Sequence, residues 1–105
     1  MPIPKLIRDR IPTIIAASGR QCRTSVLNEA EFRTALLAKL VEEAREVQTA
    51  PAGELLTELA DVLEVFDTLL TTYQLTLPQV RERQQQRRRT RGGFDGRLQL
   101  DWVGE

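Results

Sequence analysis

The sequence predicts an all-α fold built on an antiparallel pair of helices. Residues 28–49 and 52–73 each place apolar side chains at intervals of three and four, the spacing that gathers them on one face of a helix. The connection at residues 50–53 is short and contains proline and glycine, so the two helices are expected to be antiparallel neighbours. The 105 residues fit a single domain, residues 1–105.

The N-terminal part of the chain is expected to contribute little to this pair. Asp9 is predicted to cap a short helix that stops near Gly19, a residue suited to the position after a helix end. Residues 20–27 are predicted to form a loop or a short extended piece, with Val26 and Leu27 turned inward.

The two central helices carry clear start signals and broad apolar faces. Asn28 is a good N-cap, and Glu31 three residues later completes an approximate capping box. The first of these helices is expected to run to about Thr49. The apolar face of the second is predicted to consist of Leu55, Leu56, Leu59, Val62, Leu63, Phe66, Leu69, Leu70 and Tyr73.

The C-terminal third differs in composition. Thr76 is expected to cap a helix over residues 79–91, in which Val80 is the only aliphatic side chain, so this helix cannot lie in a core along its length. Residues 97–103 alternate apolar and polar side chains and predict a short extended segment or strand. Such a strand needs a partner, either residues 20–27 or another subunit.

Acidic residues border the apolar faces of both central helices. Glu43 and Glu46 lie three apart on one helix, and Glu58 and Asp61 lie three apart on the other. If these faces meet, four carboxylates converge and repel one another unless a cation joins them. Oxygen ligands without histidine or cysteine suit Mg²⁺, with Mn²⁺ as a substitute. The competing interpretation is a solvated acidic face, against which stands the scarcity of nearby lysine.

Charge is unevenly distributed although the net charge is zero. Residues 1–28 carry five basic and one acidic side chain, residues 29–67 carry three basic and ten acidic, and residues 78–105 carry seven basic and four acidic. Two explanations account for this pattern equally well. Opposite charges pack together, or a metal site in the middle is flanked by cations that bind a polyphosphate. In the second case Arg87, Arg88 and Arg91 are candidates for phosphate binding, with Lys5 and Arg8 as weaker ones.

Several classes of protein are excluded by composition. The chain has no histidine and a single cysteine, Cys22, which rules out a Ser–His or Cys–His nucleophile pair and a zinc site of the usual type. No Gly-rich phosphate loop is present. No apolar run approaches the length that spans a bilayer, and no signal peptide is visible, so we expect a cytoplasmic protein without a membrane partner.

Four short motifs, in this order, resemble those of one family. They are Lys5–Pro12 (KLIRDRIP), Glu42–Glu46 (EEARE), Glu58–Val62 (ELADV) and Arg91–Phe94 (RGGF). The two acidic motifs resemble the ExxE and ExxD signature of the MazG-like nucleotide pyrophosphohydrolases. The outer two are similar to the ends of its phosphoribosyl-ATP pyrophosphohydrolase-like subgroup. The resemblance covers nearly the whole chain.

The resemblance implies an all-α hydrolase that requires Mg²⁺ and cleaves a nucleotide between its α and β phosphates. It implies a nucleotide substrate, a homodimer or homotetramer, and a sanitising role on unwanted nucleotides. By motif, the metal ligands are Glu43, Glu46, Glu58 and Asp61, and Glu42 or Glu43 orients or deprotonates the attacking water. One departure is the gap of eleven residues between Glu46 and Glu58, at or slightly below the short end of the family's usual spacing.

Two other functions compete with this hypothesis. The six arginines and one glutamate of residues 79–91 fit contact with nucleic-acid phosphates, but the acidic middle and the lack of interleaved aromatic residues argue against a nucleic-acid partner. A non-catalytic helical interaction module is the other alternative, against which stands the complete acidic set.

Overall fold

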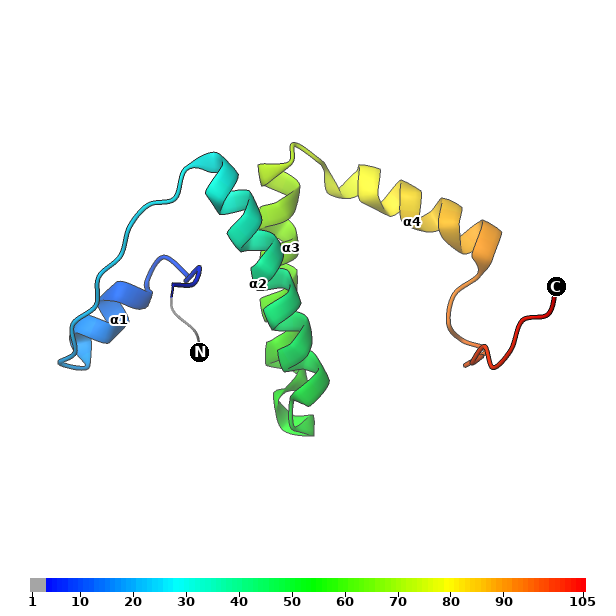
Figure 1. The fold of residues 1–105 in the computed structure, drawn as a ribbon, viewed down its shortest axis with the longest axis horizontal. Coiled ribbons are helices and arrows are strands. Elements are labelled where there is room, and N and C mark those ends of the chain that lie inside the picture. Colours follow the sequence, from blue (N-terminus) through cyan, green and yellow to red (C-terminus); the bar gives the residue numbers. More distant parts are fainter. Residues whose placement is uncertain (1–3) are drawn as a thin grey trace.

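In the computed structural model, residues 4–105 are described and form an open arrangement of helices (Figure 1). Within these residues there are four α-helices, one 3-10 turn and no β-strand. In chain order the elements are α1 (Ile11–Ala17), α2 (Glu29–Thr49), η1 (Ala52–Glu54), α3 (Leu55–Thr72) and α4 (Leu77–Arg91). The prediction of an all-α fold is therefore confirmed.

Reciprocal hydrogen bonds fix the starts of α2 and α4 where the sequence predicts them. The Asn28 side chain accepts from the backbone N–H of Glu31 at 2.8 Å, and the Glu31 carboxylate accepts from the backbone N–H of Asn28 at 3.0 Å. Thr76 and Gln79 form a box of the same kind at the start of α4. Each box satisfies two of the N–H groups that lack a partner at a helix N-terminus.

The predicted start of α1 is wrong. The N-cap is Arg10 rather than Asp9, and no side chain caps the helix. Arg10 has φ −91° and ψ −2°, which is close to helical backbone, whereas an N-cap residue whose side chain caps the helix typically has extended backbone itself. The end of the helix agrees with the prediction, because Gly19 follows it with φ +81°, a left-handed conformation that glycine adopts readily.

The centre of the molecule is the pair formed by α2 and α3, which lie side by side and are joined through η1 (Figure 1). Leu36 of α2 and Val65 of α3 are the buried apolar side chains within residues 4–105, with 3% and 7% of their surface exposed. At the end of the pair away from η1, the guanidinium of Arg33 lies 4.9 Å from the centre of the Tyr73 ring. A cation–π contact of this kind contributes about 0.5–1 kcal/mol at an exposed site.

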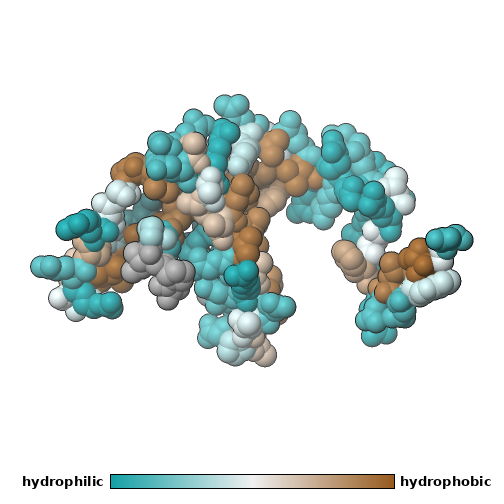
Figure 2. All heavy atoms as spheres, in the orientation of Figure 1, coloured by the Kyte–Doolittle hydropathy of each residue, from teal (hydrophilic) through white to brown (hydrophobic). Residues whose placement is uncertain are grey.

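The chain does not close into a compact globule. Its radius of gyration is 18.2 Å, whereas a compact domain of this length has about 13 Å. Large apolar side chains remain exposed on the pair, and Figure 2 shows apolar atoms on its surface. On α2 and α3 these residues are Leu37, Val41, Leu55, Leu56, Leu59 and Leu63. A single chain therefore leaves much of the apolar surface of the pair uncovered.

Two predictions outside the pair are wrong. Residues 97–103 form no strand, whereas residues 20–27 form a loop, one of the two forms predicted for them. The two segments lie at opposite ends of the molecule (Figure 1), so neither supplies the other with the hydrogen-bonding partner that a strand requires. Val26 is fully exposed and Leu27 is also classed as exposed, so these side chains are not turned inward.

No helix within residues 4–105 combines the length and the apolar content needed to cross a bilayer.

Candidate metal centre

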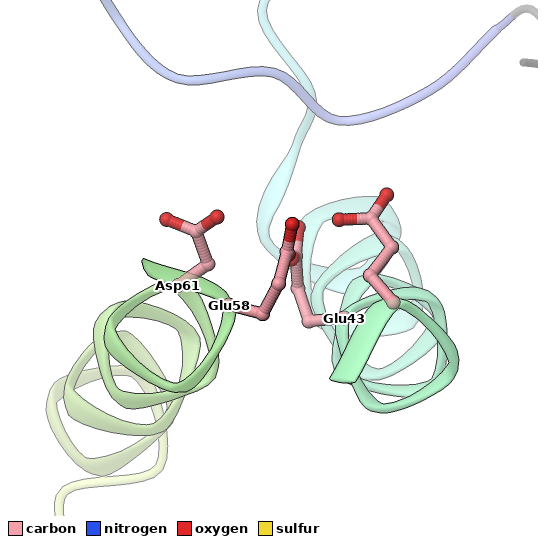
Figure 3. Close-up of side chains that lie close together, drawn as sticks. Glu43, Glu58 and Asp61 are labelled. Carbon is pink, nitrogen blue, oxygen red and sulfur yellow. The ribbon is translucent and has the colours of Figure 1, made fainter. Parts of the chain in front are cut away.

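The pairing of α2 and α3 brings four carboxylates to one place. Glu43 and Glu46 belong to α2, and Glu58 and Asp61 belong to α3. Figure 3 shows how Glu43, Glu58 and Asp61 project from the two helices. One oxygen atom from each side chain lies within 4.8 Å of the others. Because the helices run antiparallel and each pair is about one turn apart, the two acidic turns meet near the η1 end of the pair. The expected convergence of these four residues is observed; their role as metal ligands stays a prediction.

Glu43 is the buried member of the group. Only 6% of its surface is exposed, and its Oε2 atom has no hydrogen-bond donor among the described residues. Burial raises the pKa of the Glu43 carboxyl, and repulsion from Glu46 raises this pKa further, while Lys39 lowers it. A buried carboxylate oxygen without a donor is costly. Glu58 repeats this feature, because its Oε2 atom is also buried without a donor.

Lys39 lies beside the group and was missed as a site residue by the sequence analysis. Its ammonium is 3.5 Å from Glu43 Oε1 and 3.4 Å from Glu42 Oε2, and the lysine side chain is largely buried. The scarcity of nearby lysine was therefore a poor argument for a metal. The signal was present in the sequence, since Lys39 precedes the two glutamates by three and four residues and shares their side of the helix.

Glu42 lies next to the four carboxylates rather than among them. Its Oε2 atom accepts a hydrogen bond from Lys39, and its Oε1 atom is buried without a donor. A cavity of about 490 Å³ adjoins it, lined by Glu42 and Glu46 from α2 and by Lys5 from the N-terminal segment. Lys5 and Glu42 thus line a cavity beside the acidic group.

Arg8 reaches the acidic group from the N-terminal segment. Its Nη2 atom donates to Asp61 Oδ1 at 2.7 Å. A second cavity, of about 460 Å³, is lined by Arg8 and its neighbours together with Glu43 and Asp61. The N-terminal segment therefore passes over the side of the helix pair on which the carboxylates lie (Figure 3).

The donor set fits a hard divalent cation. All four groups offer carboxylate oxygens, which Mg²⁺ and Mn²⁺ prefer. At a Mg–O distance of about 2.1 Å, ligands on opposite sides of one ion are about 4 Å apart, a separation similar to the observed spread of 4.8 Å. The buried oxygens of Glu43 and Glu58 that lack a donor are compatible with a positive partner at this place.

The arginines of α4 are not brought to this group within one chain. α4 begins beyond the end of α3 that lies away from η1, and it points away from the pair (Figure 1). Asp61 and Thr72 are eleven positions apart, which alone corresponds to about 16 Å along the helix axis. Arg88 instead faces Asp95 at 4.0 Å. Within a single chain Arg87, Arg88 and Arg91 do not lie near the acidic group. Their phosphate-binding role stays a prediction.

Comparison with known proteins gives one relative without an assigned activity. No family model matches the chain, and no solved structure matches it. Over 46 residues the chain is 48% identical to an uncharacterized protein of Mycolicibacterium smegmatis. The aligned part covers 44% of this chain and 47% of that relative, so the chain matches about half of the relative's length.

Proposed function

We propose that the protein is a Mg²⁺-dependent nucleoside triphosphate pyrophosphohydrolase of the MazG-like kind. It cleaves between the α and β phosphates and releases a nucleoside monophosphate and pyrophosphate, with a role in removing unwanted nucleotides. The observation that carries the proposal is the meeting of four carboxylates from two helices, with buried oxygens that lack a donor. The order of the four short motifs along the chain supports the same reaction class.

The positions of the side chains support distinct roles. The four carboxylates hold the ion, and Mn²⁺ is expected to replace Mg²⁺ because it prefers the same oxygen ligands. When bound, the ion supplies positive charge that attracts and polarises the phosphates. Glu42 lies outside the four carboxylates and has one buried oxygen without a donor. We therefore assign to Glu42 the role of general base, which accepts the proton of the attacking water. Lys39, 3.4 Å from Glu42, fixes the direction of that carboxylate.

Pyrophosphate release from a panel of ribo- and deoxynucleoside triphosphates tests this proposal. We expect release from at least one member with Mg²⁺ or Mn²⁺ and none after chelation of the metal. The variant Glu58→Gln removes a ligand charge and is expected to lower the rate by at least about 100-fold. The matched control is Asp67→Asn, an exposed acidic residue of the same helix outside the group, which should leave the rate unchanged. Equal loss in both variants would contradict the assignment.

We further propose that a second copy of the chain covers the apolar surface of the pair, in a homodimer or a homotetramer built from two dimers. Leu56, Leu59 and Leu63 recur at intervals of three and four on α3, so they share one face, and all three are exposed. Sedimentation velocity at micromolar concentration is the test. A stable monomer would contradict this association.

A nucleic-acid partner is the second candidate function. The observation that favours it is the exposure of every arginine on α4, a helix whose only aliphatic residue between positions 79 and 91 is Val80. Retention on heparin at moderate salt, lost when Arg87, Arg88 and Arg91 are replaced by glutamine, would favour this candidate. Weak retention together with metal-dependent hydrolysis favours the enzyme.

A non-catalytic module would bind its partner equally well with Glu58→Gln.

A further inference from the structure

The contact between Arg8 and Asp61 joins segments that are 53 residues apart in the chain. The guanidinium donates to Asp61 Oδ1 at 2.7 Å, yet the Arg8 side chain is 57% exposed and the Asp61 side chain 32% exposed. Arg8 belongs to a stretch without regular structure, and the contact with Asp61 ties that stretch to α3. This ion pair therefore lies at the surface of the acidic group and stays open to solvent.

Arg8 and Lys39 neutralise the acidic group in different ways. Lys39 is anchored on α2, one turn before Glu43, and its side chain is only 17% exposed. Its position follows from the helix itself. Arg8 precedes α1, which begins at Ile11, and only its backbone carbonyl is tied to that helix, by accepting from the Ile11 N–H at 3.1 Å. Movement of the Arg8 side chain away from Asp61 would break their ion pair and no helical hydrogen bond, whereas the Lys39 side chain is largely buried and starts from a backbone position that α2 fixes beside Glu43.

The Arg8 contact conflicts with the proposed use of Asp61 as a metal ligand. The Oδ1 atom that accepts from Arg8 belongs to one of the four carboxylates that would surround the ion. A divalent cation and a guanidinium on the same carboxylate repel each other. In the absence of the ion, however, the guanidinium offsets the mutual repulsion of the four carboxylates. Arg8 and the metal therefore compete for Asp61.

We infer that Arg8 is an exchangeable cation, which neutralises Asp61 in the metal-free protein and binds the phosphates of the substrate once Mg²⁺ occupies the acidic group. The inference rests on the proposed function and adds to it a residue and a sequence of contacts. The planar guanidinium binds phosphate oxygens in a bidentate manner. The cavity of about 460 Å³ that Arg8 shares with Glu43 and Asp61 has the size of a small-ligand site.

Calorimetric titration of the full chain with Mg²⁺, without nucleotide, is the first half of the test. Arg8→Gln removes the competing cation and is expected to bind Mg²⁺ about two- to five-fold more tightly, the effect of one exposed ion pair. The matched control is Arg23→Gln, which makes the same change of net charge at an exposed arginine of an irregular segment. Its Mg²⁺ affinity should equal that of the wild type.

Titration with inorganic pyrophosphate at saturating Mg²⁺ is the second half. Arg8→Gln is expected to bind pyrophosphate at least about ten-fold more weakly, the loss of one charge-assisted hydrogen bond. Arg23→Gln should again match the wild type. Arg8→Lys keeps the positive charge but loses the planar guanidinium that binds in a bidentate manner. We therefore expect nearly wild-type Mg²⁺ affinity and weakened pyrophosphate binding. Far-UV circular dichroism verifies that each variant folds.

The outcomes separate this inference from the proposed function. Opposite shifts in Arg8→Gln, tighter for Mg²⁺ and weaker for pyrophosphate, support the exchange. Weaker or unchanged Mg²⁺ binding in Arg8→Gln overturns it, because Arg8 then only positions Asp61 or is without effect. Unchanged pyrophosphate binding also overturns it. A wild-type protein that binds neither Mg²⁺ nor Mn²⁺ overturns the proposed function itself, and the exchange with it.

Discussion

Helices α2 and α4 begin with the same kind of capping hydrogen bonds but differ in how they pack. Both α2 and α4 start with a reciprocal capping box, formed by Asn28 with Glu31 and by Thr76 with Gln79. α2 then packs against α3, whereas α4 extends away from the pair and buries no residue (Figure 1). The comparison shows that local hydrogen bonds decide where a helix begins, while apolar residues at helical spacing decide whether it packs.

The largest effect is expected from a substitution in the exposed apolar surface of the helix pair. Leu59→Lys places a charge in the proposed contact with a second copy, and we expect the assembly to dissociate into monomers. Sedimentation velocity measures this change. Leu98→Lys is the control, since Leu98 is equally apolar and is exposed in the C-terminal tail. Loss of the assembly in Leu98→Lys instead would place the contact in the tail.

Truncation in the pair and in α4 should differ in effect. Leu36 is 3% exposed, and Leu36→Ala is expected to lower the free energy of unfolding by about 2–4 kcal/mol. Val80 is the only aliphatic residue of α4 between positions 79 and 91 and is not fully buried, so Val80→Ala should cost less than about 1 kcal/mol. Urea unfolding measures both values. Equal losses would show that α4 packs in solution.

Removal of one buried charge should stabilise the metal-free pair. Glu43→Gln ends the repulsion from Glu46 and the burial of a charge, so we expect the metal-free protein to gain about 1 kcal/mol. The same variant should lose the rise in melting temperature that Mg²⁺ gives the wild type. Thermal unfolding with and without Mg²⁺ measures both effects, and a stabilised variant that still responds to Mg²⁺ would remove Glu43 from the ligand set.

The raised pKa of Glu43 gives this prediction a pH dependence. In the folded state the pKa of Glu43 lies above its ordinary value of 4.5. Between these two pKa values the unfolded state therefore binds fewer protons than the folded state. The stability of the metal-free wild type therefore falls as the pH rises from about 4.5 through the higher folded pKa. Glu43→Gln should show a smaller fall, and an equal fall in both proteins would contradict the assignment.

Loss of the two capping boxes should give the smallest effects. Asn28→Ala is expected to lower the free energy of unfolding by about 1 kcal/mol, because α2 unfolds together with α3. Thr76→Ala weakens a helix that supports little else, so we expect local fraying of α4 with nearly unchanged global stability. Hydrogen exchange resolves the two cases. Global loss in Thr76→Ala would show that α4 is coupled to the pair.

The sequence alone predicted the parts of this protein that depend on neighbours up to four residues away. The capping residues Asn28 and Thr76, the end of α2 at Thr49, and the spacing of the acidic residues on each helix belong to this class. The short connection then made the two acidic turns meet. Lys39 was equally predictable, because it lies one turn before Glu43, but it was overlooked.

Only the tertiary structure decided the remaining features. The burial of Glu43, the contact of Arg8 with Asp61 across 53 residues, the separation of α4 from the acidic group and the absence of a strand at residues 97–103 belong here. Each depends on which distant segments are brought together. Hydrogen bonds within one helix turn follow from the order of residues, whereas burial, long-range ion pairs and strand pairing need partners that only the packing of the whole chain supplies.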